Sequence, residues 1–179
     1  MNLFAQDNLP AGDPLESMMI RTVTPNDAIA IAEIYNYYVL TTFISFELEP
    51  VSPEDMSGRI SEVLGASHPW LVLENEGRVA GYAYATKWRS RPAYRPTVET
   101  TVYVSKDQRG HGFGRAVYTR LLADLAMAGF HTAIGVIALP NEASVRLHES
   151  LGFKQAAHFR EVGSKFGKWI DSGFWQMML

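Results

Sequence analysis

The residues best suited to chemistry in this 179-residue chain form a glycine-rich stretch between a β-rich run and a helical run, Arg109-Gly110-His111-Gly112-Phe113-Gly114-Arg115. Glycines at a strand-to-helix turn allow a ligand to approach the backbone closely, and the first turn of a helix leaves N–H groups without partners. The positive end of the helix dipole attracts anions to the same place. The stretch therefore predicts a pyrophosphate-binding turn, with Arg109 and Arg115 adding positive charge beside it.

Two common phosphate-binding motifs do not fit this stretch. The dinucleotide fingerprint needs GxGxxG after a first strand and an acidic residue about 20 positions later, whereas this turn follows the fourth expected strand and lacks the third glycine at that spacing. A nucleoside-triphosphate loop needs Gly-Lys-Ser/Thr, which is absent from the turn. Glycines that serve only a tight turn remain the alternative interpretation.

The strand expected before the turn, Val98–Val104, carries one carboxylate. Strand side chains alternate between two faces, which places Glu99, Thr101 and Tyr103 opposite the mostly apolar Val98, Thr100, Val102 and Val104. The first face is available for chemistry and the second for packing. Glu99 is a candidate catalytic carboxylate, and an ion pair with an arginine of the preceding loop is the alternative.

That preceding loop, Trp88–Pro96, concentrates positive charge. It contains Arg89 and Arg91, with Tyr94 beyond them, and its two prolines exclude a regular element. Guanidinium groups suit a carboxylate or a phosphinate. A solvated charged loop would have the same composition.

Hydrophobic periodicity predicts the elements that must position these residues. The expected order is strand, two helices, three strands, helix, strand, helix and two strands. The first strand is Met19–Val23, Thr24-Pro25 and Ser52-Pro53 start the two helices, and Trp70–Glu74 pairs with Arg78–Lys87 across Gly77. Gly81 suggests a bulge, Gly129 ends the third helix, and Asn141 caps a short helix from Glu142 to Ser150 after the strand Thr132–Ala138. The last two strands are expected near His158–Val162 and Phe174–Met178, joined by a turn region Lys165–Trp169.

Composition limits the class of protein. The formal net charge is -3 and there is no cysteine, which excludes disulfides, thiolate zinc sites and a cysteine nucleophile. Slight acidity disfavours nucleic-acid binding, which needs a basic surface. No apolar run is long enough to cross a bilayer, and residues 1–18 lack the pattern of a signal peptide. We expect a cytoplasmic protein without a metal, with 1–18 as a disordered leader or over-long start and 19–179 as a single domain.

Three separated motifs resemble one known family. Arg109–Gly114 matches the acyl-CoA loop of the GNAT N-acetyltransferase superfamily, and Asn141 followed by Leu147–Phe153 matches its second signature, with His148 where most members have tyrosine. Within that superfamily, the chain resembles the phosphinothricin N-acetyltransferase family over residues 19–179. The resemblance lies in the amino-acid sequences of three segments, Val98–Ser105, Ser144–Glu149 and Lys168–Gln176.

The resemblance implies an α/β fold. It is a GNAT-like mixed, largely antiparallel twisted sheet of about seven strands flanked by about four helices and splayed where the cofactor enters. It also implies acetyl-CoA as co-substrate and a homodimer. The cofactor-binding residues it implies are Val102, Tyr103, Val104, Arg109, Gly110, His111, Gly112, Phe113, Gly114, Arg115 and Asn141.

The implied reaction is direct attack of a small amine on the acetyl thioester in a ternary complex. Most amines are protonated at neutral pH, so a general base is useful, and the family places it at Glu99. His148 could protonate the leaving thiolate, orient the amine, support Glu99 or be purely structural. The implied substrate-binding residues are Arg89, Arg91, Tyr94, Tyr103 and Tyr118.

The expected function is therefore acetylation of the amino group of a small acidic amino-acid analogue, such as phosphinothricin or methionine sulfoximine. Another small amine or a protein amine as acceptor is an alternative, and a CoA-binding sensor without turnover is another. A nucleic-acid binder ranks third.

Overall fold

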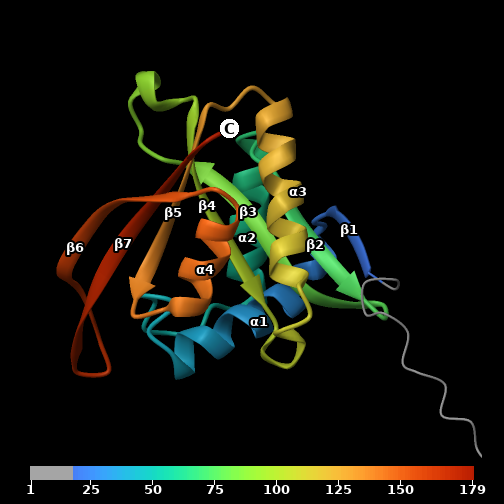
Figure 1. The fold of residues 1–179 in the computed structure, drawn as a ribbon. Coiled ribbons are helices and arrows are strands. Elements are labelled where there is room, and N and C mark those ends of the chain that lie inside the picture. The colour runs from blue at the N-terminus through green and yellow to red at the C-terminus, as the bar shows by residue number, and fades with distance from the viewer. Residues whose placement is uncertain (1–17) are drawn as a thin grey trace, which may run out of the picture.

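The computed structural model describes residues 18–179, which form one seven-stranded sheet with four α-helices (Figure 1). The strands are β1 (Met18–Thr22), β2 (Trp70–Asn75), β3 (Arg78–Lys87), β4 (Thr97–Val104), β5 (Thr132–Leu139), β6 (Lys154–Lys165) and β7 (Lys168–Met178). The helices are α1 (Ala28–Thr41), α2 (Pro53–Gly65), α3 (Phe113–Met127) and α4 (Glu142–Ser150). This order of elements confirms the predicted one.

The sheet has the order β1-β2-β3-β4-β5-β7-β6, and its neighbouring strands are antiparallel except for β4 and β5. The parallel pair is short, because Thr97–Thr100 of β4 pairs with Thr132–Gly135 of β5 and the pairing ends there. The two strands continue for several residues beyond this point. The predicted mixed, splayed sheet is thus confirmed, and the splay divides it into a β1–β4 half and a β5–β7–β6 half.

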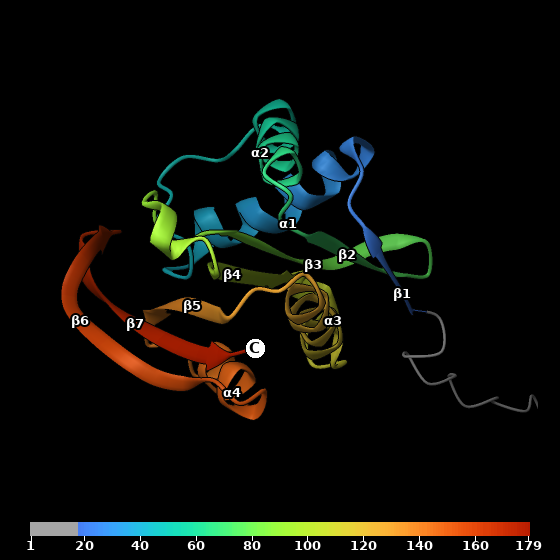
Figure 2. The same ribbon diagram turned by 90° about the horizontal axis from the view of Figure 1, so that it is seen from above.

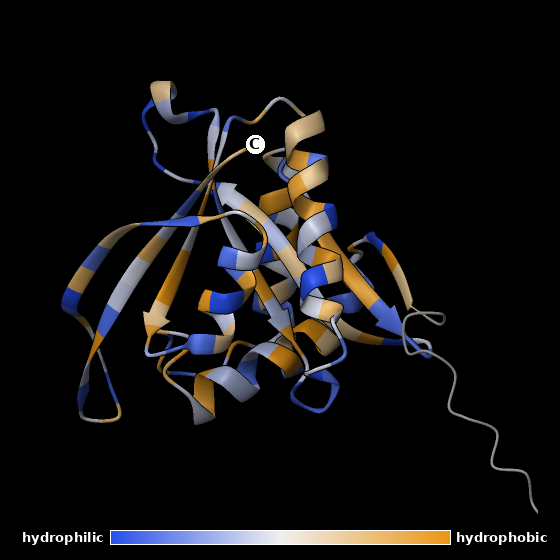
Figure 3. Cartoon of the chain, viewed as in Figure 1, coloured by the Kyte–Doolittle hydropathy of each residue, from blue (hydrophilic) through white to orange (hydrophobic). Residues whose placement is uncertain are grey.

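The helices cover both faces of the sheet. Figure 2 shows α1 and α2 on one face and α3 and α4 on the other. Each face has its own apolar cluster: Val98 packs with α3 on one side, and Tyr82 packs with α1 and α2 on the other. Hydrophobic residues lie along the inner strands of the sheet and along α1 and α3, whereas the loops are mostly hydrophilic (Figure 3). The alternation predicted for β4 follows from this two-sided packing.

Local sequence explains where the helices begin. Ser52 caps α2 by accepting a hydrogen bond from the Asp55 backbone N–H at 3.0 Å, with Pro53 in the first turn. The Asn141 side chain caps α4 by accepting from the Ser144 N–H at 3.2 Å. Helix α3 begins after Gly112, whose φ of 80° is in the left-handed region that favours glycine.

The bulge predicted at Gly81 is confirmed, because Leu73 pairs with Gly81 while Glu74 pairs with Val79, which leaves the neighbouring Ala80 as the extra residue of β3. Gly81 is also needed for space, since a Cβ there would lie 2.9 Å from the Tyr103 carbonyl oxygen. The last two strands are much longer than predicted, with only Phe166-Gly167 between them.

The predicted leader lies outside the described residues, except that Met18 already belongs to β1. Within residues 18–179, no helix is long and apolar enough to cross a bilayer.

Candidate active site

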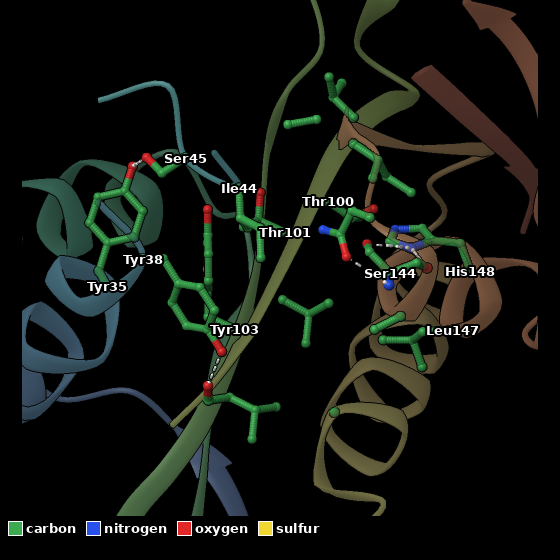
Figure 4. A pocket seen from close by; sticks show the side chains of 18 of the residues that line it. Tyr35, Tyr38, Ile44, Ser45, Thr100, Thr101, Tyr103, Ser144, Leu147 and His148 are labelled. Atoms are coloured by element: carbon green, nitrogen blue, oxygen red, sulfur yellow. Dashed lines mark hydrogen bonds between the residues drawn. The ribbon is translucent and has the colours of Figure 1, made fainter. Parts of the chain in front are cut away.

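A cavity of about 380 Å³ lies where β4 and β5 separate. Figure 4 shows side chains of α1 and the loop after it on one side of β4, and side chains of α4 on the other. Its lining includes Tyr35, Tyr38, Ile44, Ser45, Phe46, Tyr84, Glu99, Thr100, Thr101, Val102, Tyr103, Val104, Arg109, Gly114, Val136, Ile137, Ala138, Asn141, Ala143, Ser144, Leu147, His148 and Ser172. Glu99 and Arg109 are the charged members of this lining.

The cofactor side of the cavity is built mainly from backbone. Beyond Thr100, no strand among residues 18–179 pairs with β4 on its β5 side, so residues 101–104 present a strand edge to the cavity. The Tyr38 hydroxyl donates to the Val104 carbonyl and holds α1 against the end of this edge. An extended ligand such as a pantetheine arm suits an unpaired edge of this kind.

The glycine-rich turn sits next to this edge. Gly110 and Gly112 both have positive φ, and a Cβ at either position would meet nothing within 4 Å. Among the described residues, no side chain caps the first turn of α3. Its N–H groups are thus available to an anion at the positive end of the helix dipole. These features fit the diphosphate of CoA.

The predicted cofactor residues fall into two groups. Val102, Tyr103, Val104, Arg109, Gly114 and Asn141 line the cavity, whereas Gly110, His111, Gly112, Phe113 and Arg115 surround the start of α3. The Phe113 side chain is buried in the core and stacks with His111 at 5.7 Å. Arg115 donates to the Ser150 hydroxyl at 2.8 Å, so it also fastens α3 to α4.

Glu99 is half-buried in the cavity wall. It lies on β4 opposite Thr86 of β3 and Ile134 of β5, at the last part of the parallel pairing. Burial raises the pKa of the Glu99 carboxyl, and the positive charge of Arg89 opposes that rise. A carboxyl with a raised pKa is a stronger base than an exposed one.

Tyrosines form the wall beside Glu99. The ring of Tyr103 meets Tyr35 edge-on at 5.3 Å and Tyr38 at 5.1 Å, and Tyr84 lines the cavity nearby. Burial raises the pKa of Tyr84 to about 12, so its hydroxyl stays protonated. Tyr35, Tyr38 and Tyr84 are cavity residues that the sequence does not reveal, because a tyrosine in a helix or strand usually packs in a core.

His148 is held by hydrogen bonds on both ring nitrogens. Its Nδ1 lies 2.8 Å from the Ser144 carbonyl oxygen, which only accepts, so Nδ1 carries the proton. Its Nε2 then accepts from the Tyr118 hydroxyl at 3.1 Å, and that hydroxyl also contacts the Thr100 Oγ1 at 2.7 Å. Burial lowers the pKa of His148, in agreement with a neutral ring. The arrangement favours the orienting and structural roles over proton donation.

Gly135 makes room for this histidine. A Cβ on Gly135 would lie 2.3 Å from His148 Nε2 and 2.6 Å from its Cδ2. The requirement is invisible in the sequence, because Gly135 and His148 meet only when α4 packs beside β5.

The predicted substrate residues are less close to the cavity. Tyr118 is fully buried and is not among the residues that line the cavity, and its hydroxyl hydrogen-bonds to His148. Its contact with the acceptor stays a prediction. Arg89, Arg91 and Tyr94 lie in the exposed loop beyond β3, outside the lining. Arg89 stacks over the Trp88 ring at 4.8 Å, and its charge acts on Glu99. Tyr103 does line the cavity.

The chain is similar to known acetyltransferases. Residues 20–174 match the model of the acetyltransferase (GNAT) domain family. A phosphinothricin N-acetyltransferase of Streptomyces viridochromogenes is 44% identical over 93% of this chain and 89% of its own length. An L-methionine sulfoximine/L-methionine sulfone acetyltransferase of Salmonella typhimurium is 40% identical over 90% of this chain and 95% of its own.

A solved acetyltransferase structure from Salmonella typhimurium, described with its cofactor acetyl-CoA, is also similar. Its TM-score is 0.88 at 39% identity, covering 91% of this chain and 94% of that chain. The fold and the sequence are thus both similar to those of acetyltransferases. The chain therefore belongs to the GNAT acetyltransferases and, among them, to the phosphinothricin N-acetyltransferase family.

Proposed function

We propose that this protein is an acetyl-CoA-dependent N-acetyltransferase whose acceptor is the amino group of a small acidic amino-acid analogue of the phosphinothricin or methionine sulfoximine type. The observation that carries the proposal is the half-buried Glu99, with its raised pKa, on the strand whose unpaired edge faces the cavity. One strand thus presents a base and a cofactor-binding edge to the same space. The names of the relatives support the acceptor class.

The residues divide the work as follows. The edge of β4 and the Asn141 side chain hold the pantetheine arm, and the turn before α3 holds the diphosphate. When bound, acetyl-CoA supplies an acetyl thioester. Glu99 takes a proton from the acceptor's ammonium group, directly or through water, so that the nitrogen lone pair can form the new C–N bond as the C–S bond breaks. The nitrogen gives up its second proton to solvent as the amide forms, and the leaving thiolate takes up a proton from solvent.

His148 contributes as a neutral, fixed side chain in the cavity wall. Both ring nitrogens form hydrogen bonds within the protein, so the imidazole helps to hold the cavity wall in place and does not exchange protons with the leaving group. Arg89 is the predicted partner of the acceptor's acidic end, because its charge already acts on Glu99 and its side chain is exposed enough to turn inward. Arg91 and Tyr94 stay predictions of the same kind.

The test is acceptor-dependent release of CoA thiol from acetyl-CoA. Phosphinothricin, methionine sulfoximine and methionine sulfone are compared with ordinary amino acids, a polyamine and a lysine peptide. The chain contains no cysteine, so the protein adds no thiol background. We expect turnover with the glutamate-like and methionine-derived compounds and its loss in Glu99→Gln. Glu62→Gln, an exposed change on α2, is the matched control.

Turnover confined to other amines would contradict the acceptor class. Binding of acetyl-CoA without turnover of any amine would instead favour a CoA-binding sensor.

The expected homodimer belongs to the same proposal. The edge strand β6 and the start of β7 expose the apolar side chains of Phe159, Val162 and Trp169, a surface that a second copy would cover. Sedimentation of the full chain tests this. The cytoplasmic location stays a prediction.

A further inference from the structure

The outer wall of the cavity beside the tyrosines is a loop without regular structure, residues 42–47, between α1 and α2. Its residues Ile44, Ser45 and Phe46 line the cavity, and Ser45 is buried. Irregular loops at binding sites are usually more mobile than the elements they connect. Contacts on both sides of this loop therefore decide how wide the cavity is.

On one side the loop is fastened to its own helices. The Tyr35 hydroxyl of α1 and the Ser45 Oγ lie 2.8 Å apart, and the Ser45 Oγ also accepts from the Glu47 N–H at 3.2 Å. Arg59 of α2 pairs with Glu47 at 2.6 Å. These contacts join the loop to the β1–β4 half of the protein.

On the other side the loop is held by the tip of the β6–β7 hairpin, which belongs to the opposite half of the splayed sheet. The Lys165 Nζ donates to the Ser45 carbonyl oxygen at 2.7 Å, and Phe166 packs edge-on against Phe43 at 5.6 Å. Gly163 leaves room for Phe46, since a Cβ there would lie 2.6 Å from that ring. Figure 1 shows the hairpin reaching down toward the end of α1.

Lys165 is unusual in being only 2% exposed. A buried ammonium group is costly unless it is paired, yet among residues 18–179 no carboxylate forms an ion pair with it. The Lys165 ammonium group donates a hydrogen bond to the Ser45 carbonyl oxygen, and Glu47 acts on it through charge alone. An apolar side chain would fill the same space without this cost, so packing by itself does not account for a lysine here.

We propose that Lys165 is a positioning residue that ties the two halves of the sheet together across the cleft, closes the acceptor end of the cavity and restricts the acceptor to a single amino acid. The inference rests on the proposed function and specifies its acceptor size. Without this tie, the loop would swing away from β7 and Phe46 would no longer bound the cavity. A longer amine, such as the N-terminus of a peptide, would then enter.

The experiment compares Lys165→Met with wild type, using the best amino-acid acceptor found for the wild type and the dipeptide that begins with that amino acid. Methionine keeps the length and apolar stem of lysine and removes the donor. Lys165→Arg retains a cation that can reach the carbonyl. Lys154→Met, at the exposed opposite end of β6, is the matched control.

We expect the KM of Lys165→Met for the amino acid to rise about tenfold, the scale of losing a hydrogen bond from a charged group. Its KM for acetyl-CoA should stay within about twofold, and its kcat/KM for the dipeptide relative to the amino acid should rise. Lys165→Arg should restore the selectivity, and Lys154→Met should resemble wild type. Amide hydrogen exchange in residues 42–47 should accelerate in Lys165→Met but not in Lys165→Arg or Lys154→Met.

Gly163→Ala is an independent test of the same cavity wall, because it displaces Phe46. It should shift the selectivity in the same direction even if Lys165→Met folds poorly. Unchanged selectivity and unchanged exchange in both variants would overturn the inference. A wild type that acetylates no amino acid would instead overturn the proposed function, and the exchange measurement would still report on Lys165.

Discussion

The close packing of Gly135 against the His148 ring predicts that Gly135→Ala displaces that ring. The added Cβ would lie 2.3 Å from Nε2 and 2.6 Å from Cδ2, whereas ordinary contacts between such atoms are about 3.5–4.0 Å. Either the strand or the ring must therefore move by more than about 1 Å. The strand is held on both sides, because Gly135 pairs with Thr100 of β4 and with Trp175 of β7. We expect the imidazole to move.

The cost follows from the contacts that are lost. Overpacking a buried site costs about 1–3 kcal/mol, and the broken hydrogen bond from Tyr118 adds about 0.5–1.5 kcal/mol. We expect Gly135→Ala to lower the free energy of unfolding by about 2–4 kcal/mol, which corresponds to a Tm lower by about 4–16 °C for a domain of this size. We also expect kcat/KM to fall at least about tenfold, because His148 forms part of the cavity wall.

A double-mutant cycle isolates the cause. In a His148→Ala background the ring is gone, so Gly135→Ala should cost less than about 0.5 kcal/mol in urea unfolding. If Gly135→Ala cost the same free energy in both backgrounds, a clash with His148 would not be the origin of that cost, and the conclusion that Gly135 makes room for His148 would be refuted.

Three further predictions follow from the same contacts. For Glu99, log kcat/KM should rise with pH up to a pKa higher than the ordinary glutamate value, because a protonated carboxyl cannot accept a proton. This pH dependence should vanish in Glu99→Gln, together with about 10²–10⁴ of the rate. Tyr118→Phe should lower the free energy of unfolding by about 1–2 kcal/mol in urea, since His148 Nε2 loses its donor, while acetyl-CoA binding by calorimetry stays unchanged. Hydrogen bonding from Arg21 lowers the pKa of Asp27, so this carboxylate stabilises the fold above its unfolded pKa of about 4 and loses that effect as the pH falls through the lowered value. Asp27→Asn should therefore be less stable than wild type at pH 7 and approach it near pH 2; equal stability at both pH values would contradict this.

Much of the fold could be read from local patterns. Caps at Ser52 and Asn141, the two-face alternation of β4 and the glycine turn before α3 are short-range features, so neighbouring residues suffice to predict them. The edge strand β6 was predicted too short because almost all of its residues are exposed, which leaves no alternation between apolar and polar positions. Burial creates the pattern that sequence reasoning uses, and an edge strand has little of it.

The sequence by itself determined which candidate groups this protein has: a carboxylate on a strand, a glycine-rich turn after it, and a histidine on a short capped helix, in an order that resembles one family. Tertiary structure decided which groups are free to act. It engaged both nitrogens of His148, buried Tyr118 behind it, left Arg91 and Tyr94 outside the cavity and joined Lys165 to a loop 120 positions away in sequence. These outcomes depend on how the halves of a splayed sheet and their helices pack, and no spacing along one chain encodes the distance between residues that meet only through the fold.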